Sequence, residues 1–190
     1  MNDGRTVYPS GYVAINDGCI LSVGAQENCP YDTAAKVIDA QGKAILPGFV
    51  NTHTHVHDIL LRGGLSDDRK LYDWLFNVIY TGLSAYGPEE IEAAGTLYCI
   101  EAIRSGITTF VDCHDFSADR VDMAVDGLIS NYDRYGVRAV LARMFIDHMP
   151  TDMDAYIDAI ISRGPEQRLP WDPIESTEEA LASIEATIKR

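Results

Sequence analysis

The pattern of apolar and polar positions before residue 47 differs from the pattern after it. Residues 11–24 (GYVAINDGCILSVG) form two short apolar runs around Asn16-Asp17-Gly18. Asp-Gly supplies the positive φ angles of a tight turn, so this stretch predicts a β-hairpin. Residues 35–48 (AKVIDAQGKAILPG) predict two more short strands, separated at Gln41-Gly42. The chain before residue 47 is therefore predicted to be all-β.

From residue 47 onwards, apolar strands alternate with helical patterns. Strands are predicted at 48–55, 107–114 and 137–146. Helical spacing or helix start and stop signals predict helices at 70–83, 87–106, 118–136, 151–163 and 176–190. Apolar strands between helices indicate a parallel sheet with right-handed crossovers. The change of pattern marks a boundary between a domain at 1–46 and a domain at 47–190.

Composition and charge exclude several classes of protein. The chain has 190 residues, 46% of them hydrophobic, which is typical of a globular protein with a core. It has no apolar run long enough to span a membrane, and its polar N-terminus predicts no secretory signal. A net charge of −14 argues against binding to nucleic acid. The four cysteines show no CxxC spacing, which favours a reducing cytoplasm over a disulfide framework or a cysteine-built metal site.

Histidines alternate with other residues after the apolar run at the start of the second domain. His53, His55 and His57 are three of the five histidines in the chain. Residues i and i+2 of a strand share a face, so His53 and His55 point the same way, with His57 next in line if the strand continues. Imidazole nitrogens are good ligands for zinc, iron or nickel, and strand ends carry the active sites of parallel barrels. The alternative is a set of histidines satisfied by ordinary surface or core contacts.

The residues around these histidines carry a family resemblance. The segment LPGFVNTHTH resembles the first barrel strand of the amidohydrolase superfamily. Further segments resemble its s-triazine hydrolase branch, the melamine deaminases and atrazine chlorohydrolases: HTHVHDILLRGG, YDWLFNVIY (72–80), LYCIEAIRSGITT (97–109) and ARMF (142–145). The N-terminal hairpins resemble the small β-domain of that family. The resemblance covers residues from about 10 to about 160.

The resemblance implies an α/β fold with the first three or four units of a (β/α)8 TIM-like barrel, preceded by part of a small β-sandwich. It also implies that His53 and His55 bind one divalent metal ion, zinc or iron. The remaining ligands and the catalytic acid/base are expected beyond residue 190, so we expect the chain to be an N-terminal fragment. Two histidines leave an ion mostly water-coordinated, so the chain alone is expected to bind metal weakly and to show no deamination.

Four other side chains are candidates for substrate contact, and each has an alternative. His57 is a candidate for contact with substrate or with the residues around the metal. The alternative is a solvent-exposed loop histidine. Trp74 is a candidate for stacking on a flat heterocycle. The alternative is a core position beside Leu71 and Leu75. Asp112 and His114 follow a barrel strand and either line the pocket or support other residues.

The predicted function is metal-dependent hydrolysis of a C–N bond in an aminated N-heterocycle of the s-triazine, pyrimidine or purine type. A bound metal makes water a nucleophile at neutral pH, and the amine then leaves. The alternatives are dechlorination or removal of an alkylamine, a non-catalytic metal-binding protein that uses HTHVH as a chelating strip, and a decayed gene product. The expected partner is a small heterocyclic substrate, with no nucleic acid and no membrane, and the complete protein is a possible homo-oligomer.

Overall fold

The computed structural model describes residues 4–63, 69–116, 119–147 and 175–189. The chain divides into two compact units, Met1–Pro47 and Gly48–Arg190. That they represent a β-sandwich domain and a barrel domain remains a prediction.

The first unit contains a hairpin of two antiparallel strands, β1 (Gly11–Asn16) and β2 (Cys19–Ala25). Its turn residues Asp17 and Gly18 have φ angles of 50° and 75°. Both angles lie in the left-handed region, which the Asp-Gly pair adopts at low cost and which matches the twist of the strands. The hairpin predicted from the sequence is confirmed.

The two strands predicted at 35–48 are wrong. No strand is present there, and none of the described residues pairs with this stretch. Its apolar side chains are largely exposed, with 80% of Val37 and 64% of Leu46 accessible. An apolar run forms a strand only when a second backbone satisfies its N–H and C=O groups, and the sequence pattern carries no information about that partner.

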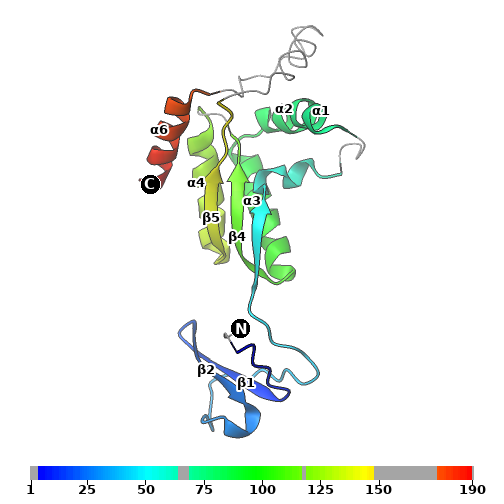
Figure 1. Ribbon diagram of the computed structural model, residues 1–190, viewed down its shortest axis with the longest axis vertical. Helices are drawn as coiled ribbons and strands as arrows, with labels where there is room; N and C mark the ends of the chain where they lie inside the picture. The colour runs from blue at the N-terminus through cyan, green and yellow to red at the C-terminus, as the bar shows by residue number, and fades with distance from the viewer. Residues whose placement is uncertain (1–3, 64–68, 117–118, 148–174, 190) are drawn as a thin grey trace. The chain divides into compact units, whose positions relative to one another are not determined.

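The second unit is built on a parallel sheet of three strands in the order β3-β4-β5. These strands are β3 (Phe49–Thr54), β4 (Ile107–His114) and β5 (Arg138–Arg143). Helix α3 (Pro88–Arg104) connects the first two strands, and α4 (Val121–Tyr135) connects the second pair. Both helices pack on one face of the sheet (Figure 1). The predicted strands, their parallel arrangement and the alternation with helices are confirmed.

Local signals in the sequence explain where these helices begin and end. Pro88 occupies the first turn of α3, and the Glu90 side chain accepts a 2.7 Å hydrogen bond from the backbone N–H of Gly87. Helix α4 ends at Gly136, whose φ of 65° is the left-handed C-cap conformation. Helix α6 (Thr177–Ile188) begins with a capping box. The predicted helix at 151–163 lies outside the described residues.

The helix predicted at 70–83 forms as a single helical run with a wider turn in its middle. It comprises α1 (Leu71–Trp74), a π-helical turn (Leu75–Ile79) and α2 (Tyr80–Ser84). Figure 1 shows α1 and α2 beyond the carboxyl ends of the three strands, which is the edge of the sheet where the histidines lie. None of the described helices combines the length and the apolar character that crossing a membrane requires.

The core of the second unit lies between the sheet and the helices. Phe110 of β4 is fully buried and makes edge-to-face contacts with Tyr98 of α3 and Tyr132 of α4, at centroid distances of 4.8 and 5.1 Å. Because side chains alternate along a strand, the face of β4 that carries Phe110 is the helix-covered face. This assignment decides where the polar residues further along β4 point.

Candidate metal centre

An extra residue in β3 decides which way its histidines face. Asn51 pairs with Phe110 and Thr54 pairs with Asp112, so three steps along β3 match two steps along β4. An irregularity of this kind reverses the alternation of side chains between the two faces. Asn51 points to the helix layer, where its side-chain amide donates to the Tyr98 hydroxyl at 3.1 Å. His53, beyond the irregularity, is exposed.

His53 and His55 lie together at the carboxyl end of β3, as the sequence predicts. Their ring centroids are 5.0 Å apart, with the rings nearly perpendicular. Nδ1 of His55 lies 2.7 Å from the carbonyl oxygen of Cys113. Since a carbonyl oxygen only accepts, Nδ1 carries the hydrogen and Nε2 of a neutral His55 carries the free lone pair. The hydrogen bond thus fixes the ring in the tautomer that can bind a metal through Nε2.

The strand does not continue to His57. The backbone turns at His55 and forms a 3-10 helix, η2 (Val56–Leu61). His57 consequently leaves the face that His53 occupies and becomes fully buried, with its ring 5.1 Å from that of Phe116. The interpretation of His57 as an exposed loop histidine is wrong, because the alternation in the sequence does not reveal a turn at His55.

Two carboxylates surround the buried ring of His57. Nε2 lies 2.8 Å from Oδ1 of Asp115 and 3.2 Å from Oδ1 of Asp58. Burial by itself lowers the pKa of His57, but the hydrogen bond and charge of Asp115 and the charge of Asp58 outweigh burial and raise the pKa. Burial also raises the pKa of Asp58, whereas the proximity of His57 leaves the pKa of Asp115 below its usual value despite burial.

The donor groups in this region fit a divalent metal. Within the parts of the chain that the structure describes, His55, His57 and Asp58 each offer one ligand atom, and these atoms lie within 4.8 Å of one another. Two imidazoles and one carboxylate form a donor set that suits zinc or iron. His55 is common to this group and to the pair predicted from the sequence. His53 does not belong to the group but lies beside His55.

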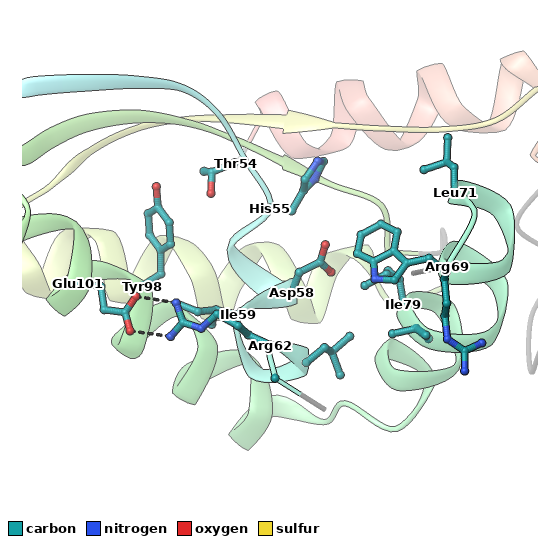
Figure 2. A pocket seen from close by; sticks show the side chains of 14 residues that line it. Thr54, His55, Asp58, Ile59, Arg62, Arg69, Leu71, Ile79, Tyr98 and Glu101 are labelled. Carbon is teal, nitrogen blue, oxygen red and sulfur yellow. Dashed lines mark hydrogen bonds and ion pairs between the residues drawn. The ribbon is translucent and has the colours of Figure 1, made fainter. Parts of the chain in front are cut away.

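An open hollow of about 760 Å³ adjoins these donors. His55 and Asp58 reach it from the end of β3 and from the following turn, while Leu71 and Ile79 line it from the helical segment opposite (Figure 2). Trp74 lines the same hollow and also packs against the hydrophobic core. Its contact with substrate remains a prediction. The hollow has the size of a small-molecule site.

Asp112 and His114 lie on the helix-covered face of β4, and both are fully buried. Oδ1 of Asp112 accepts a 2.9 Å hydrogen bond from the Val56 N–H, and Oδ2 accepts a 2.6 Å bond from the Tyr132 hydroxyl. Burial lowers the pKa of His114 to about 4, so its ring is neutral at pH 7. Neither residue lines the hollow. Their contact with substrate remains a prediction, and the bonds of Asp112 favour a positioning role.

Reasoning from the sequence missed Asp58, Asp115 and Tyr132. Asp58 directly follows the histidine alternation, and Asp115 directly follows His114, so both stand beside residues that the sequence singled out. Tyr132 gives no such signal, because it occupies an ordinary apolar position of an amphipathic helix. Only the packing of α4 on β4 brings its hydroxyl to Asp112.

Comparison with curated proteins identifies relatives of this chain. The chain is 37% identical over 143 residues to a 5-methylthioadenosine/S-adenosylhomocysteine deaminase of Bacillus cereus, a match that covers 75% of this chain and 32% of that protein. It is 34% identical over 140 residues to the protein of the same name from Symbiobacterium thermophilum, covering 74% of this chain and 30% of that protein. The chain therefore spans about a third of the length of these relatives.

Solved structures share the fold. Guanine deaminase of Escherichia coli superposes with a TM-score of 0.67 at 21% identity, over 94% of this chain and 44% of that one. A mutant atrazine chlorohydrolase of Arthrobacter aurescens, complexed with zinc and atraton, gives a TM-score of 0.61 at 19% identity, over 93% and 46%. Residues 44–190 match the model of the amidohydrolase family. The family predicted from the HTH segment is thereby confirmed: the chain belongs to the amidohydrolase family.

Proposed function

We propose that the protein carrying this chain is a metal-dependent deaminase, which hydrolyses the bond between an exocyclic amino group and a carbon of a nitrogen heterocycle. His53 and His55 are the proposed ligands of one divalent ion, zinc or iron. The deaminase names of the relatives at 34–37% identity support the reaction type. The donor chemistry of the HTH segment supports the metal.

One observation carries this proposal above the others. The rings of His53 and His55 meet at the carboxyl end of a parallel strand, and the Cys113 carbonyl orients His55 so that Nε2 is free. When bound there, a divalent metal supplies Lewis-acid activation of the attacking water. The chain's own contribution is to hold the two imidazoles in place before the ion arrives, which removes the cost of ordering them at the moment of binding.

The hollow beside His55 supports a flat heterocycle as the substrate. Trp74, Leu71 and Ile79 give it an apolar wall, and aromatic rings bind flat heterocycles by stacking. Arg62 and Glu101 at its edge are joined by hydrogen bonds of 2.9 and 2.7 Å (Figure 2). We propose a substrate of the purine or s-triazine type, with Trp74 against the ring.

The experiment measures both metal content and product for the protein carrying this chain, loaded with zinc. Ammonia release is assayed with 5-methylthioadenosine, S-adenosylhomocysteine, guanine and melamine, and chloride release is assayed with atrazine. His53→Ala is expected to lose metal and to reduce ammonia release by about 100-fold or more. Thr52→Ala, a change at the neighbouring exposed position of β3, is the matched control and is expected to retain both.

Three outcomes would contradict the proposal. A His53→Ala variant that keeps its metal and a near-normal rate would end the assignment of His53 as a ligand. Release of chloride without any release of ammonia would replace deamination with dechlorination. Metal binding without turnover of any of these compounds would favour a non-catalytic metal-binding protein.

A further inference from the structure

Helix α2 and the turn η2 approach each other closely at a glycine. A β-carbon on Gly82, which lies inside α2, would be 2.6 and 2.9 Å from the two δ-carbons of Leu61. Carbons in van der Waals contact are about 3.5–4.0 Å apart, so no larger residue fits without a movement. The backbone of Gly82 has no positive φ angle that would require glycine. Glycine is unfavourable inside a helix, and the contact with Leu61 is therefore what excludes a side chain at this position.

The Leu61 side chain lies between this contact and the hollow beside His55. Leu61 is the last residue of η2, it packs against the hydrophobic core, and it lines the hollow together with Trp74 and Ile79. Protein cores are close-packed and leave little room for a displaced methyl group. A side chain on α2 that pushes the δ-carbons of Leu61 therefore pushes them into the hollow.

Hydrogen bonds fix the backbone on both sides of the contact. Arg62, the residue after Leu61, donates hydrogen bonds of 2.9 and 2.7 Å to the two carboxylate oxygens of Glu101 on α3 (Figure 2). Arg120 donates a 2.7 Å hydrogen bond to the carbonyl oxygen of Leu83 in α2. These bonds hold η2 and α2 in place, so the δ-carbons of Leu61 take up the displacement, which is about 1 Å from the 2.6 Å approach to ordinary contact.

We propose that Gly82 is a positioning residue that sets substrate specificity: the space it leaves for Leu61 keeps the hollow wide enough for an aminated heterocycle that carries a substituent beyond the ring. Gly82 does not line the hollow and acts through Leu61. The hollow of about 760 Å³ lies in the upper half of the range that holds drug-sized ligands, which is more than a bare heterocycle fills. The inference deepens the proposed function and rests on it for the aminated heterocycle.

The competing interpretation is that the close approach serves only the packing of α2 on η2. In that case a larger residue at position 82 lowers stability and leaves the protein's preference between bare and substituted heterocycles unchanged. The two interpretations differ in a ratio of affinities, which a purely structural role does not alter.

The test compares Gly82→Ala with the unaltered protein carrying this chain, loaded with zinc. Two pairs of compounds share an aminated ring and differ in the substituent: 5-methylthioadenosine with adenine, and N-ethylmelamine with melamine. Calorimetry measures Kd for each compound, and KM is measured for each one that is hydrolysed. We expect Gly82→Ala to raise Kd about tenfold or more for a substituted compound and less than about twofold for its bare partner.

Two further variants separate the hollow from the packing. Leu61→Val shortens the displaced side chain, so Gly82→Ala/Leu61→Val is expected to recover most of the lost affinity, a non-additive effect of residues in contact. Gly127→Ala on α4 is the matched control, because its β-carbon would lie 2.7 Å from Cγ2 of Ile91, and neither residue lines the hollow. It is expected to lower the melting temperature and to leave the ratio of affinities within each pair unchanged.

Thermal unfolding checks that each variant is folded. If Gly82→Ala is unfolded, Leu61→Val alone decides, because it widens the hollow from the same side and should shift the ratio towards the substituted compound. An unchanged ratio in the deciding variant, or no binding of either substituted compound, would overturn the inference; ammonia release in that case leaves the proposed function standing. A shifted ratio in a protein that binds these compounds without releasing ammonia would retain the role of Gly82 and reject the proposed function.

Discussion

Tyr132 donates a 2.6 Å hydrogen bond from its hydroxyl to Oδ2 of the buried carboxylate of Asp112. The other oxygen of Asp112 accepts the bond from the Val56 N–H. One carboxylate therefore joins α4, the end of β4 and the turn that carries the candidate metal ligands. Burial raises the pKa of Asp112 and these two hydrogen bonds oppose the rise, so the carboxylate depends on both donors.

Removing the hydroxyl in Tyr132→Phe is expected to lower the free energy of unfolding by about 1–3 kcal/mol, because Oδ2 of Asp112 is left buried without a donor. Urea unfolding followed by circular dichroism measures the change. Tyr135→Phe, one turn further along α4, is the control and should change stability by less than about 0.5 kcal/mol. Equal stability of Tyr132→Phe and the unaltered chain would show that this carboxylate does not need the tyrosine.

The elements of the second unit could be predicted because their signals are local. The alternation of apolar strands with helices, Pro88 at the start of α3 and Gly136 at the end of α4 are all visible in short windows of sequence. The stretch at 35–48 has an equally apolar pattern, yet it forms no strand. A strand depends on a partner elsewhere in the chain, so a window of sequence cannot establish it.

The candidate metal centre also has a part that local sequence predicts and a part that depends on distant residues. That His53 and His55 lie together follows from the spacing of two, which is a local property. The turn at His55 and the burial of His57 depend on Asp112, which is 56 residues away from Val56 in the sequence. The extra residue in β3 arises from its register with β4 and has no periodic signature. The neighbours of His57 therefore had to come from the structure.

The ion pair between Arg143 and Glu175 is the most deeply buried one between Lys or Arg and a carboxylate in the described parts of the chain. Nη2 of Arg143 lies 2.5 and 2.6 Å from the two carboxylate oxygens, and the arginine side chain is only 2% exposed. Glu175→Gln leaves a buried charge without its counter-ion, so we expect a loss of about 3 kcal/mol in the free energy of unfolding. Thermal and urea unfolding measure it.

An exposed pair provides the control for that substitution. Arg134 and Glu92 are 3.4 Å apart with both side chains more than 60% exposed, so Glu92→Gln should change stability by less than about 1 kcal/mol. The double variant Arg143→Met/Glu175→Met removes both buried charges and is expected to be more stable than Glu175→Gln. If Glu175→Gln lowers the free energy of unfolding no more than Glu92→Gln does, the buried pair contributes no more to stability than a surface ion pair.

Trp74 lines the hollow beside His55, and its substitution tests whether the hollow binds substrate. In the protein carrying this chain, Trp74→Phe is expected to raise KM for an aminated heterocycle several-fold with a smaller change in kcat, because a smaller ring stacks over less area. Steady-state kinetics and the melting temperature are measured together. A lower melting temperature with unchanged kinetics per folded molecule would assign Trp74 to the core alone.

The four free cysteines differ in accessibility, which gives a probe of how the second unit opens. Cys19 is exposed, whereas Cys99 of α3 is completely buried, and burial raises the pKa of its thiol to about 11. At pH 8 a thiol with that pKa is ionised to roughly one part in a thousand, and only the thiolate reacts with a disulfide reagent.

We expect Cys19 to be labelled rapidly and Cys99 only when α3 separates from the sheet, so that urea releases the protected thiol. Peptide mass spectrometry after timed labelling identifies each site, and Cys19→Ser should remove the rapid phase. Labelling of Cys99 as fast as Cys19 in the absence of urea would contradict the packing of α3 described here.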